Sequence, residues 1–420
     1  MRTVIESDKM MQENKVVGYS WVVFGIVLCA QSITLGFGMN CIPPFLTTIA
    51  EELNLNSTQI GLAWGMIGLG ALLFSIIGGL ISDRIGVRWT GCIGLFLLAL
   101  GGAFRGLAHA YLPFLGAMLL FGVAMGLALP NFPRALSQWF PPNHRGMVNG
   151  IAVAGSAFGA AVSMAISASV LGPWLGGWRN IVLILGGITF VMAVLWLILV
   201  KERIFDETSA LTLASVFKGF GLVLRSWPVW IMSIISLLLV GHVQSWASHM
   251  PGFFEHKYGM TNAMAGQLVS VTLFSAIVAS VLGPTISDRM GLRKPALLVA
   301  CVIGAIANLV QGSFLGPVLI VILIILPFGL GTISPLLFTI PFELKGLHHS
   351  IAGAAVGMIY TFQNIGAFLY PILSGKLIDL FAPNYNAFFV AQMLAFGISF
   401  FLIWRLLPET GTRAVAGKAA

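Results

Sequence analysis

Long apolar segments separated by short polar connections run through almost the whole chain. We count twelve such segments, at residues 19–46, 58–81, 90–108, 113–137, 147–171, 181–200, 228–250, 264–286, 295–313, 316–341, 351–374 and 386–407. A helix of about 18 or more apolar residues can cross the roughly 30 Å hydrocarbon core of a membrane. The pattern therefore predicts an all-α polytopic membrane protein with twelve transmembrane helices.

The longest polar stretch between these segments lies near the middle of the chain. Residues 201–227 open with Lys201-Glu202-Arg203 and leave six apolar segments on each side. We therefore expect a tail at 1–18, an N-terminal six-helix bundle at 19–200, a linker at 201–227, a C-terminal six-helix bundle at 228–407 and a second tail at 408–420. The tail at 1–18 carries charges of both signs and no apolar core, so it is not expected to be a cleaved signal peptide.

One octapeptide occurs twice, and its two copies lie about half a chain apart. Residues Ile81–Arg88 read ISDRIGVR, and residues Ile286–Arg293 read ISDRMGLR, 205 residues further on. Pro130 and Pro335 have the same separation. Such a repeat predicts two similar halves. Because each half has an even number of spans, both halves face the same way, as parallel repeats about an axis along the membrane normal.

Lysine and arginine are distributed unequally between the two sides of this topology. With the N-terminus inside, the cytoplasmic segments hold 18 of the 22 basic residues, and the outer segments hold only Arg105, Arg179, Lys257 and Lys376. Cytoplasmic loops of membrane proteins carry such an excess. We therefore predict a protein of the cell (inner) membrane, with both termini and both octapeptides in the cytoplasm.

Composition agrees with a membrane protein and argues against several other classes. Hydrophobic residues make up 58% of the chain and charged residues 9%, whereas soluble domains average about 25% charged. The net charge of +8 therefore reflects cytoplasmic loops and not a nucleic-acid partner. The four cysteines lie in apolar segments without CxxC spacing, which is typical of small buried thiols. No nucleotide-binding or catalytic motif appears, so we expect neither enzyme activity nor a cofactor or metal.

The first octapeptide and its flanks resemble a family signature. The run Gly79-Leu80-Ile81-Ser82-Asp83-Arg84-Ile85-Gly86-Val87-Arg88 is similar to the G-x-x-x-D-R-x-G-x-R motif of the major facilitator superfamily. The second octapeptide sits in the matching place, and Gly177-Trp178-Arg179 resembles another common feature of that family. The resemblance implies a secondary transporter whose two parallel six-helix bundles work by alternating access.

Two further stretches bear on the kind of transporter. Residues Pro130-Asn131-Phe132-Pro133-Arg134, together with Trp139–Gly146, are similar to carriers of organic and inorganic anions, including the cyanate, oxalate/formate and monocarboxylate groups. The arginine often found early in helix 4 of proton-driven members is missing from Leu112–Gly122. This departure weakens any inference of a drug/proton antiport mechanism.

Both octapeptides are candidates for a conformational gate. An aspartate at a helix end can pair with an arginine of its own loop or of a neighbouring helix, or face the positive N-terminus of a helix. Such contacts would form in one conformation and break in the other. The alternative is a charged anchor that keeps the loop in the cytoplasm. The predicted gating residues are Gly79, Asp83, Arg84, Gly86, Arg88, Asp288, Arg289, Gly291 and Arg293.

The seventh span offers the richest set of candidate binding residues. His242, Ser245, Trp246 and His249 are spaced i, i+3, i+4, i+7, so they share one helical face. By the resemblance, this helix lines the substrate path with helices 1, 4 and 10. Two imidazoles beside an indole offer hydrogen-bond donors and a stacking surface. The alternative is a polar stripe packed against another helix, with His249 near the outer water.

Arg134 and Asn131 are the candidates in the fourth span. Arginine suits a carboxylate because its guanidinium presents a fork of donors, and Asn131 would be a neutral donor one turn away. The alternative for Arg134 is an arginine that extends to the membrane interface. For Arg105, near the outer end of the third span, we favour the interfacial interpretation, because helix 3 is usually peripheral in the family.

The remaining candidates are amides and one tyrosine. Tyr360, Gln363 and Asn364 share a helical face in span 11, and Gln31 and Asn40 are polar members of span 1. Each is either a ligand contact or a hydrogen bond between helices. No aspartate or glutamate lies in the middle of a span, so histidine is the side chain left to titrate there. The set of cationic and neutral donors favours an anion.

Glycine pairs also occur at the spacing that lets helices pack closely. Gly146–Gly150, Gly155–Gly159 and Gly353–Gly357 are each separated by three residues. Small residues at this spacing allow backbones to approach within a membrane. We therefore expect these pairs to lie in helix–helix contacts.

We conclude from the sequence that the chain is a secondary transporter of a small organic anion, similar to a monocarboxylate. The alternative is an exporter of hydrophobic drugs or metabolites, and a third possibility is a membrane enzyme or a receptor that transports nothing. The expected partners are a small-molecule substrate, the lipid bilayer and a co- or counter-transported ion, with no nucleic acid. The working unit is expected to be a monomer. Substrate identity and transport direction stay open.

Overall fold

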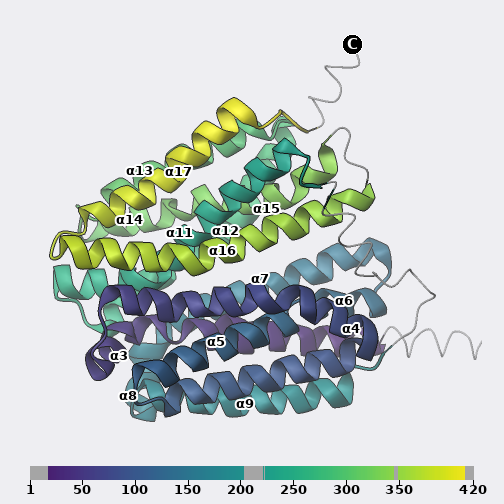
Figure 1. Cartoon of the computed structure of the whole chain (residues 1–420), viewed down its shortest axis with the longest axis horizontal. Helices are drawn as coiled ribbons and strands as arrows, with labels where there is room; N and C mark the ends of the chain where they lie inside the picture. The colour runs from purple at the N-terminus through teal and green to yellow at the C-terminus, as the bar shows by residue number, and fades with distance from the viewer. Residues whose placement is uncertain (1–17, 203–220, 222, 345–348, 412–420) are drawn as a thin grey trace, which may run out of the picture.

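The molecule consists of two helical bundles that lie side by side. The computed structural model describes residues 18–202, 221, 223–344 and 349–411, and every regular element in these ranges is a helix. Helices from the first half of the chain form the lower bundle in Figure 1, and helices from the second half form the upper one. The all-helical membrane fold expected from the apolar segments is confirmed.

The N-terminal bundle is built from long helices joined by short turns. Its first span runs from Gly18 to Leu53. Its elements are η1 (Ala30–Phe37), α2 (Gly38–Asn40), η2 (Pro43–Phe45), α3 (Leu46–Leu53), α4 (Ser57–Leu107), α5 (Tyr111–Ala128), α6 (Asn131–Trp139), α7 (Pro142–Ile166), η3 (Ser167–Leu171), α8 (Gly172–Leu175) and α9 (Trp178–Leu199).

The C-terminal bundle begins at Trp227, on the other side of the linker. Its elements are α11 (Trp227–Tyr258), α12 (Asn262–Met290), α13 (Lys294–Val310), α14 (Pro317–Ile325), α15 (Pro327–Glu343), α16 (His349–Phe381) and α17 (Asn386–Leu406). We call the end of the molecule at which α9 ends and α11 begins the linker end, on the right in Figure 1, and the opposite end the far end.

Ten helices among the described residues are long and apolar enough to cross a membrane. One of them, α4, has 51 residues and contains a non-helical residue, Gly86, with φ 84° and ψ 167°. Two of the predicted spans therefore fall within α4, on either side of this kink. Glycine adopts positive φ readily because it lacks a Cβ. The shorter apolar helix α13 corresponds to another predicted span, and the number twelve stays a prediction.

Two predicted helix ends are wrong. The first span does not end at residue 46, because the 3-10 turn at Pro43–Phe45 is followed directly by α3, which runs to Leu53. In the same way, α11 does not end at residue 250 but continues through Pro251 to Tyr258. From the sequence, these ends were expected at residues 46 and 250, each close to a proline. Inside a membrane protein, however, neighbouring helices can satisfy the backbone groups that proline frees. Phe253 and Phe254 are fully buried beyond Pro251, so tertiary packing favours the extension of α11.

The two bundles contact each other closely at the far end. A Cβ placed on Gly61 would overlap the carbonyl group of Pro371, and Gly65 approaches Phe368 in the same way.

The predicted glycine pairs behave differently. Gly155 and Gly159 do pack against the first span, but Gly146, Gly150, Gly353 and Gly357 have no described atom within 4 Å of the position a Cβ would take. For these four glycines, which lie in the linker-end halves of α7 and α16, the expected helix contact is not found among the described residues.

Candidate functional site

The first octapeptide forms an ion pair inside the N-terminal bundle. Arg134 Nη1 on α6 lies 2.5 Å from Asp83 Oδ1 on α4. Asn131, one turn before Arg134, is fully buried; it accepts a 2.6 Å hydrogen bond from Ser82 and donates one of 2.6 Å to the carbonyl of Leu127. The structure therefore brings Arg134 and Asn131 to the octapeptide, and their predicted contact with substrate finds no geometric support here.

The second octapeptide forms a larger charge network. Arg293 donates to Glu343 of α15, with Nη2 2.6 Å from Oε1, and it also donates to Asp288. The hydrogen bonds that Arg293 donates to Glu343, and then the one that it donates to Asp288, raise the pKa of Arg293 above its ordinary value because both carboxylates stabilise the charged guanidinium. Arg293 therefore links the turn after α12 to the linker end of α15.

A carboxylate that follows the last helix of each half completes the pattern. Glu409, after α17, accepts hydrogen bonds from the backbone amides of Arg293 and Lys294 at 2.8 and 3.0 Å. Glu202, after α9, accepts a 3.4 Å bond from the amide of Arg88. An anion at a helix N-terminus interacts favourably with the unpaired amides and the helix dipole. The two halves thus use the same device at the helix that follows each octapeptide.

The other predicted gating residues surround these contacts. Arg88 Nε donates to the carbonyl of Leu197 at 2.7 Å, and Gly86 and Gly291 both have positive φ. Gly79 is half-buried, and Arg84 and Arg289 are exposed. Every ion pair among the described residues joins two groups of the same half. The linker end therefore has no ion pair between the bundles within the described part of the chain, and a gating role stays a prediction.

At the far end, in contrast, hydrogen bonds connect the two bundles. Asp379 of α16 accepts bonds from the amides of Ser57 and Thr58 at 2.9 and 2.8 Å, and from the Thr58 hydroxyl at 2.6 Å. Asn262 donates to Thr48 at 2.8 Å, and His249 Nε2 lies 3.3 Å from the carbonyl oxygen of Ser57. These contacts join the two halves at the far end. His249, which was proposed from the sequence as a binding residue, takes part in them.

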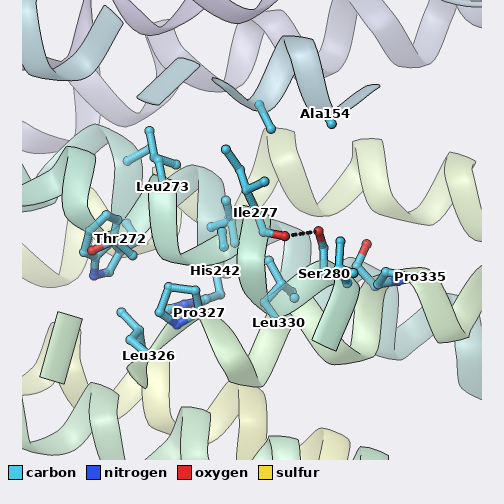
Figure 2. Close-up of a pocket in the computed structure, with 18 of the residues that line it drawn as sticks. Ala154, His242, Thr272, Leu273, Ile277, Ser280, Leu326, Pro327, Leu330 and Pro335 are labelled. Carbon is cyan, nitrogen blue, oxygen red and sulfur yellow. Dashed lines mark hydrogen bonds between the residues drawn. The ribbon is translucent and has the colours of Figure 1, made fainter. Parts of the chain in front are cut away.

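A cavity of about 530 Å³ lies between the bundles (Figure 2). One wall is α7 of the N-terminal bundle, and the other walls are α11, α12, the α14–α15 segment and Phe396 of α17. The lining is mainly aliphatic. Its polar side chains are those of His242, Trp246, Thr272, Ser280 and Ser334, and it contains no aspartate, glutamate, lysine or arginine among the described residues.

His242 and Trp246 reach this cavity from a buried polar network. His242 Nδ1 lies 2.6 Å from Oε1 of Gln392, and Gln392 Nε2 donates to Ser245 at 2.9 Å. Trp246 Nε1 donates to Gln311 at 3.1 Å. The polar face predicted on span 7 therefore packs mostly within the C-terminal bundle, as the alternative interpretation held, and only His242 and Trp246 also line the cavity.

The amides that orient this face were missed by the sequence interpretation. Gln392 lies in α17 and Gln311 follows α13, and both are fully buried. Neither amide lies on a helix that the family resemblance places around the substrate path. An amide inside an apolar span was nevertheless a usable signal, because polar groups at that depth are costly and rarely lack a partner.

The remaining candidates do not line this cavity. Asn40 and Asn364 each donate to a backbone carbonyl four residues earlier in their own helix, at 2.9 Å. Gln31 is buried within η1, and Tyr360 packs against Phe338 with ring centroids 6.5 Å apart. Gln363 is half-buried. Their predicted roles as ligand contacts stay predictions.

The interfacial interpretation of Arg105 is wrong. Its side chain is 1% exposed, Nη2 donates to the carbonyl of Gly38 at 2.9 Å, and the guanidinium lies 4.1 Å from the ring centroid of Phe121. Arg105 therefore connects helices inside the N-terminal bundle.

Comparison with known proteins identifies the family. The model of the Major Facilitator Superfamily matches residues 28–351. The chain belongs to this superfamily. An uncharacterized transporter of Bacillus subtilis is 24% identical over 372 residues, which cover 87% of this chain and 88% of that one. The probable sulfoacetate transporter of Cupriavidus necator is 21% identical over 355 residues, covering 79% and 81%.

Further matches agree on both sequence and fold. A probable galactarate/D-glucarate transporter of Escherichia coli K12 is 24% identical over 378 residues, covering 79% of this chain and 82% of that one. A bacterial homolog of the human lysosomal transporter Spinster superposes with a TM-score of 0.74 at 15% identity, covering 92% and 96% of the two chains. A mutant of a nucleoside transporter gives 0.72 at 16% identity, covering 90% and 98%. This superfamily member is a multi-pass membrane transporter and not an enzyme.

Proposed function

We propose that this superfamily member carries a small organic monoanion with an apolar body, such as a monocarboxylate, through the cavity of Figure 2. The single observation that carries this proposal is the composition of the cavity. It offers the imidazole of His242 and the hydroxyl of Thr272, and its described lining residues carry no fixed negative charge. The acidic cargo in the names of two relatives, sulfoacetate and galactarate/D-glucarate, supports the anionic part of the proposal.

The lining favours an apolar cargo over a polyhydroxylated one. Most of the side chains that surround the cavity are aliphatic, including Val269, Leu273, Ile277 and Leu330. A buried hydroxyl without a hydrogen-bond partner costs about 1–3 kcal/mol on the scale of protein mutations. A sugar acid would bury several hydroxyl groups in the cavity without hydrogen-bond partners. An alkyl or aryl acid would instead bury hydrocarbon against these side chains and direct one charged group toward the few donors.

The asymmetry between the two ends supports alternating access as the proposed mechanism. The far end is held by the bonds that Asp379 accepts from Ser57 and Thr58, whereas the ion pairs of the linker end stay within each half. In our proposal, transport breaks the Asp379 contacts and brings the two octapeptides together, so that the cavity opens to the other side. The halves would rock about the cavity between them.

Orientation in the membrane rests on the basic residues. Among the described residues, most lysines and arginines lie in segments at the linker end, and the positive-inside tendency puts such segments in the cytoplasm. In this proposal, the observed conformation opens toward the cytoplasmic side of the cell membrane and is closed toward the outside. Each monomer encloses its own cavity in this proposal, so no second copy is required for transport.

Counterflow in liposomes tests the proposal. Purified protein is reconstituted with an unlabelled acid inside, and entry of labelled phenylpyruvate, pyruvate or tartrate is followed, with protein-free liposomes subtracted. We expect saturable exchange of phenylpyruvate, weaker exchange of pyruvate and none of tartrate. Exchange of tartrate alone would contradict the apolar-body assignment.

A second candidate function is export of hydrophobic compounds. The same aliphatic lining favours it, because its described residues include no lysine or arginine that would select for an anion. Ethidium serves as the probe in the same liposomes. Movement of ethidium without exchange of any acid would establish export and exclude anion transport. Phenylpyruvate exchange that ethidium does not inhibit would exclude the exporter.

A further inference from the structure

The hydrogen bonds around His242 fix which of its nitrogens carries the proton. Gln392 Nε2 donates to Ser245 Oγ at 2.9 Å, so the amide oxygen of Gln392 points at His242 Nδ1, 2.6 Å away. A carbonyl oxygen only accepts hydrogen bonds. Nδ1 therefore carries the hydrogen, and in the neutral ring Nε2 holds a lone pair.

Nε2 has no hydrogen-bond partner among the described residues, although the ring is nearly fully buried. The His242 side chain is 3% exposed, and it lies among the side chains that line the cavity (Figure 2). It is the only ionisable side chain among the described lining residues. A proton that enters this cavity from water therefore finds one basic atom there, Nε2 of His242.

Neighbouring elements offer His242 no charged partner among the described residues. α17 contributes Gln392 and Phe396, and the ring centroid of Phe396 lies 5.1 Å from that of His242. α12 contributes Thr272.

On α16 the Tyr370 hydroxyl donates to the carbonyl of Ala391 at 2.6 Å. The segment that joins α14 and α15 presents Leu326 and Pro327, and α7 presents only alanine, glycine, valine and methionine. His249, two turns further along α11, bonds to Ser248, Ser245 and Ser57.

A carboxylate cannot rest against a lone pair, because both groups are hydrogen-bond acceptors. It can bind at Nε2 only if the ring has gained a proton there, or if the acid brings a proton on its own oxygen. Both routes give the same sum of one carboxylate and one proton, with no net charge in the cavity. Burial of a net charge in such an apolar cavity would be strongly unfavourable, so the neutral pair is the favoured occupant.

We propose that His242 couples the transport of each anion to one proton, so that the carrier is an electroneutral proton–anion symporter. This inference rests on the proposed function. On loading, Nε2 accepts a proton and the N–H donates to the carboxylate. Thr272, whose hydroxyl has no partner among the described residues, supplies a second donor. On release, the carboxylate leaves and Nε2 returns the proton to water on the same side, so charge and protons balance over the cycle.

Flux measurements in liposomes test this inference separately from the proposed function. Labelled phenylpyruvate uptake is measured with an acid-outside pH gradient or with a potassium–valinomycin potential, while a dye records alkalinisation of the medium. For the unmodified protein we expect accumulation driven by the pH gradient, no response to the potential, and about one proton taken up per anion. Net uptake of phenylpyruvate into liposomes that contain no acid, without proton uptake, would overturn the coupling and leave the proposed function intact. Absence of counterflow would overturn the proposed function itself.

Two variants show whether the proton resides on His242. In His242→Gln, an amide can donate to the carboxylate without a proton, so we expect proton uptake per anion to fall at least tenfold and uptake to respond to the potential. His256→Gln makes the same change at an exposed histidine of the same helix and should keep the ratio of the unmodified protein. An unchanged ratio in His242→Gln would contradict the assignment.

Gln392→Glu keeps the test decisive if the first variant is inactive. A carboxylate beside Nδ1–H stabilises the protonated ring, so the pH of half-maximal uptake should rise by about one unit. A midpoint that does not move would overturn the role of His242. A residue with a packing role alone would change the maximal rate and not this midpoint.

Discussion

Asp379 and Thr58 form a hydrogen-bonded cap across the boundary between the two bundles. The Asp379 carboxylate on α16 accepts the amide of Thr58 at 2.8 Å and its hydroxyl at 2.6 Å, in the first turn of α4. A carboxylate here satisfies amide donors that a helix N-terminus leaves free. Because the capped helix belongs to the other half, the cap can persist only while the far end is closed. We therefore expect Asp379 to be one of the side chains that stabilise the closed far end.

Asp379→Asn should favour opening of the far end. Hydrogen bonds to a charged group contribute about 1.5–3 kcal/mol when buried, and we expect about 1 kcal/mol here because the group is partly exposed, which is roughly a fivefold change in population. Spin labels at Leu112 and Asn384, on the far ends of the two bundles, would report a larger share of long distances. Glu51→Gln, a nearby exposed carboxylate on α3, is the control. Identical distance distributions in both variants would contradict the cap.

Arg134 and Asp83 should behave as one unit in transport. Their side chains are 2.5 Å apart with exposed fractions of 38% and 18%, so we expect a coupling energy of about 0.5–1 kcal/mol in a double-mutant cycle. Counterflow rates of Arg134→Ala, Asp83→Asn and the double variant measure it, with exposed Arg84→Ala as the control. If Arg134→Ala raises KM and its effect is simply additive with that of Asp83→Asn in the double variant, Arg134 contacts the cargo instead.

The fold could be predicted because its strongest signals are local and repeated. Apolar length determines which segments can span a membrane, and the paired octapeptides indicated two related halves. Helix ends were harder to predict. Pro251 was expected to end its span, but the aromatic residues beyond it are buried in the C-terminal bundle, and this packing extends α11 to Tyr258.

The candidate site could be predicted only in part. Helical spacing placed His242 and Trp246 on one face, and both line the cavity. Spacing does not show which neighbour a side chain will meet, so Arg134 was assigned to the substrate although Asp83, 51 positions away in the chain, lies beside it. Gln392 escaped notice for the same reason, since its contact with His242 spans 150 residues.

Gly61→Ala should hinder closure of the far end. A Cβ at this position would overlap the carbonyl group of Pro371 on the facing helix, so the two backbones must separate. We expect at least a tenfold drop in counterflow and longer far-end distances between spin labels. Gly146→Ala adds the same methyl group where no described atom lies within 4 Å, and it should transport normally. Equal activity of the two variants would show that the Gly61 contact is not needed.

Ala276→Phe should block the cavity without unfolding the protein. Ala276 on α12 lines the cavity, and a phenyl ring would fill much of the space that the cargo's apolar body needs. We expect phenylpyruvate counterflow to fall at least tenfold, while the thermal midpoint in detergent stays within a few degrees, because the ring enters existing space rather than a packed core. Val278→Phe places a ring two residues away, on a side chain that is 51% exposed and outside the cavity lining, and it should leave counterflow unchanged. If Ala276→Phe transports as fast as Val278→Phe, the cargo takes another route through the protein.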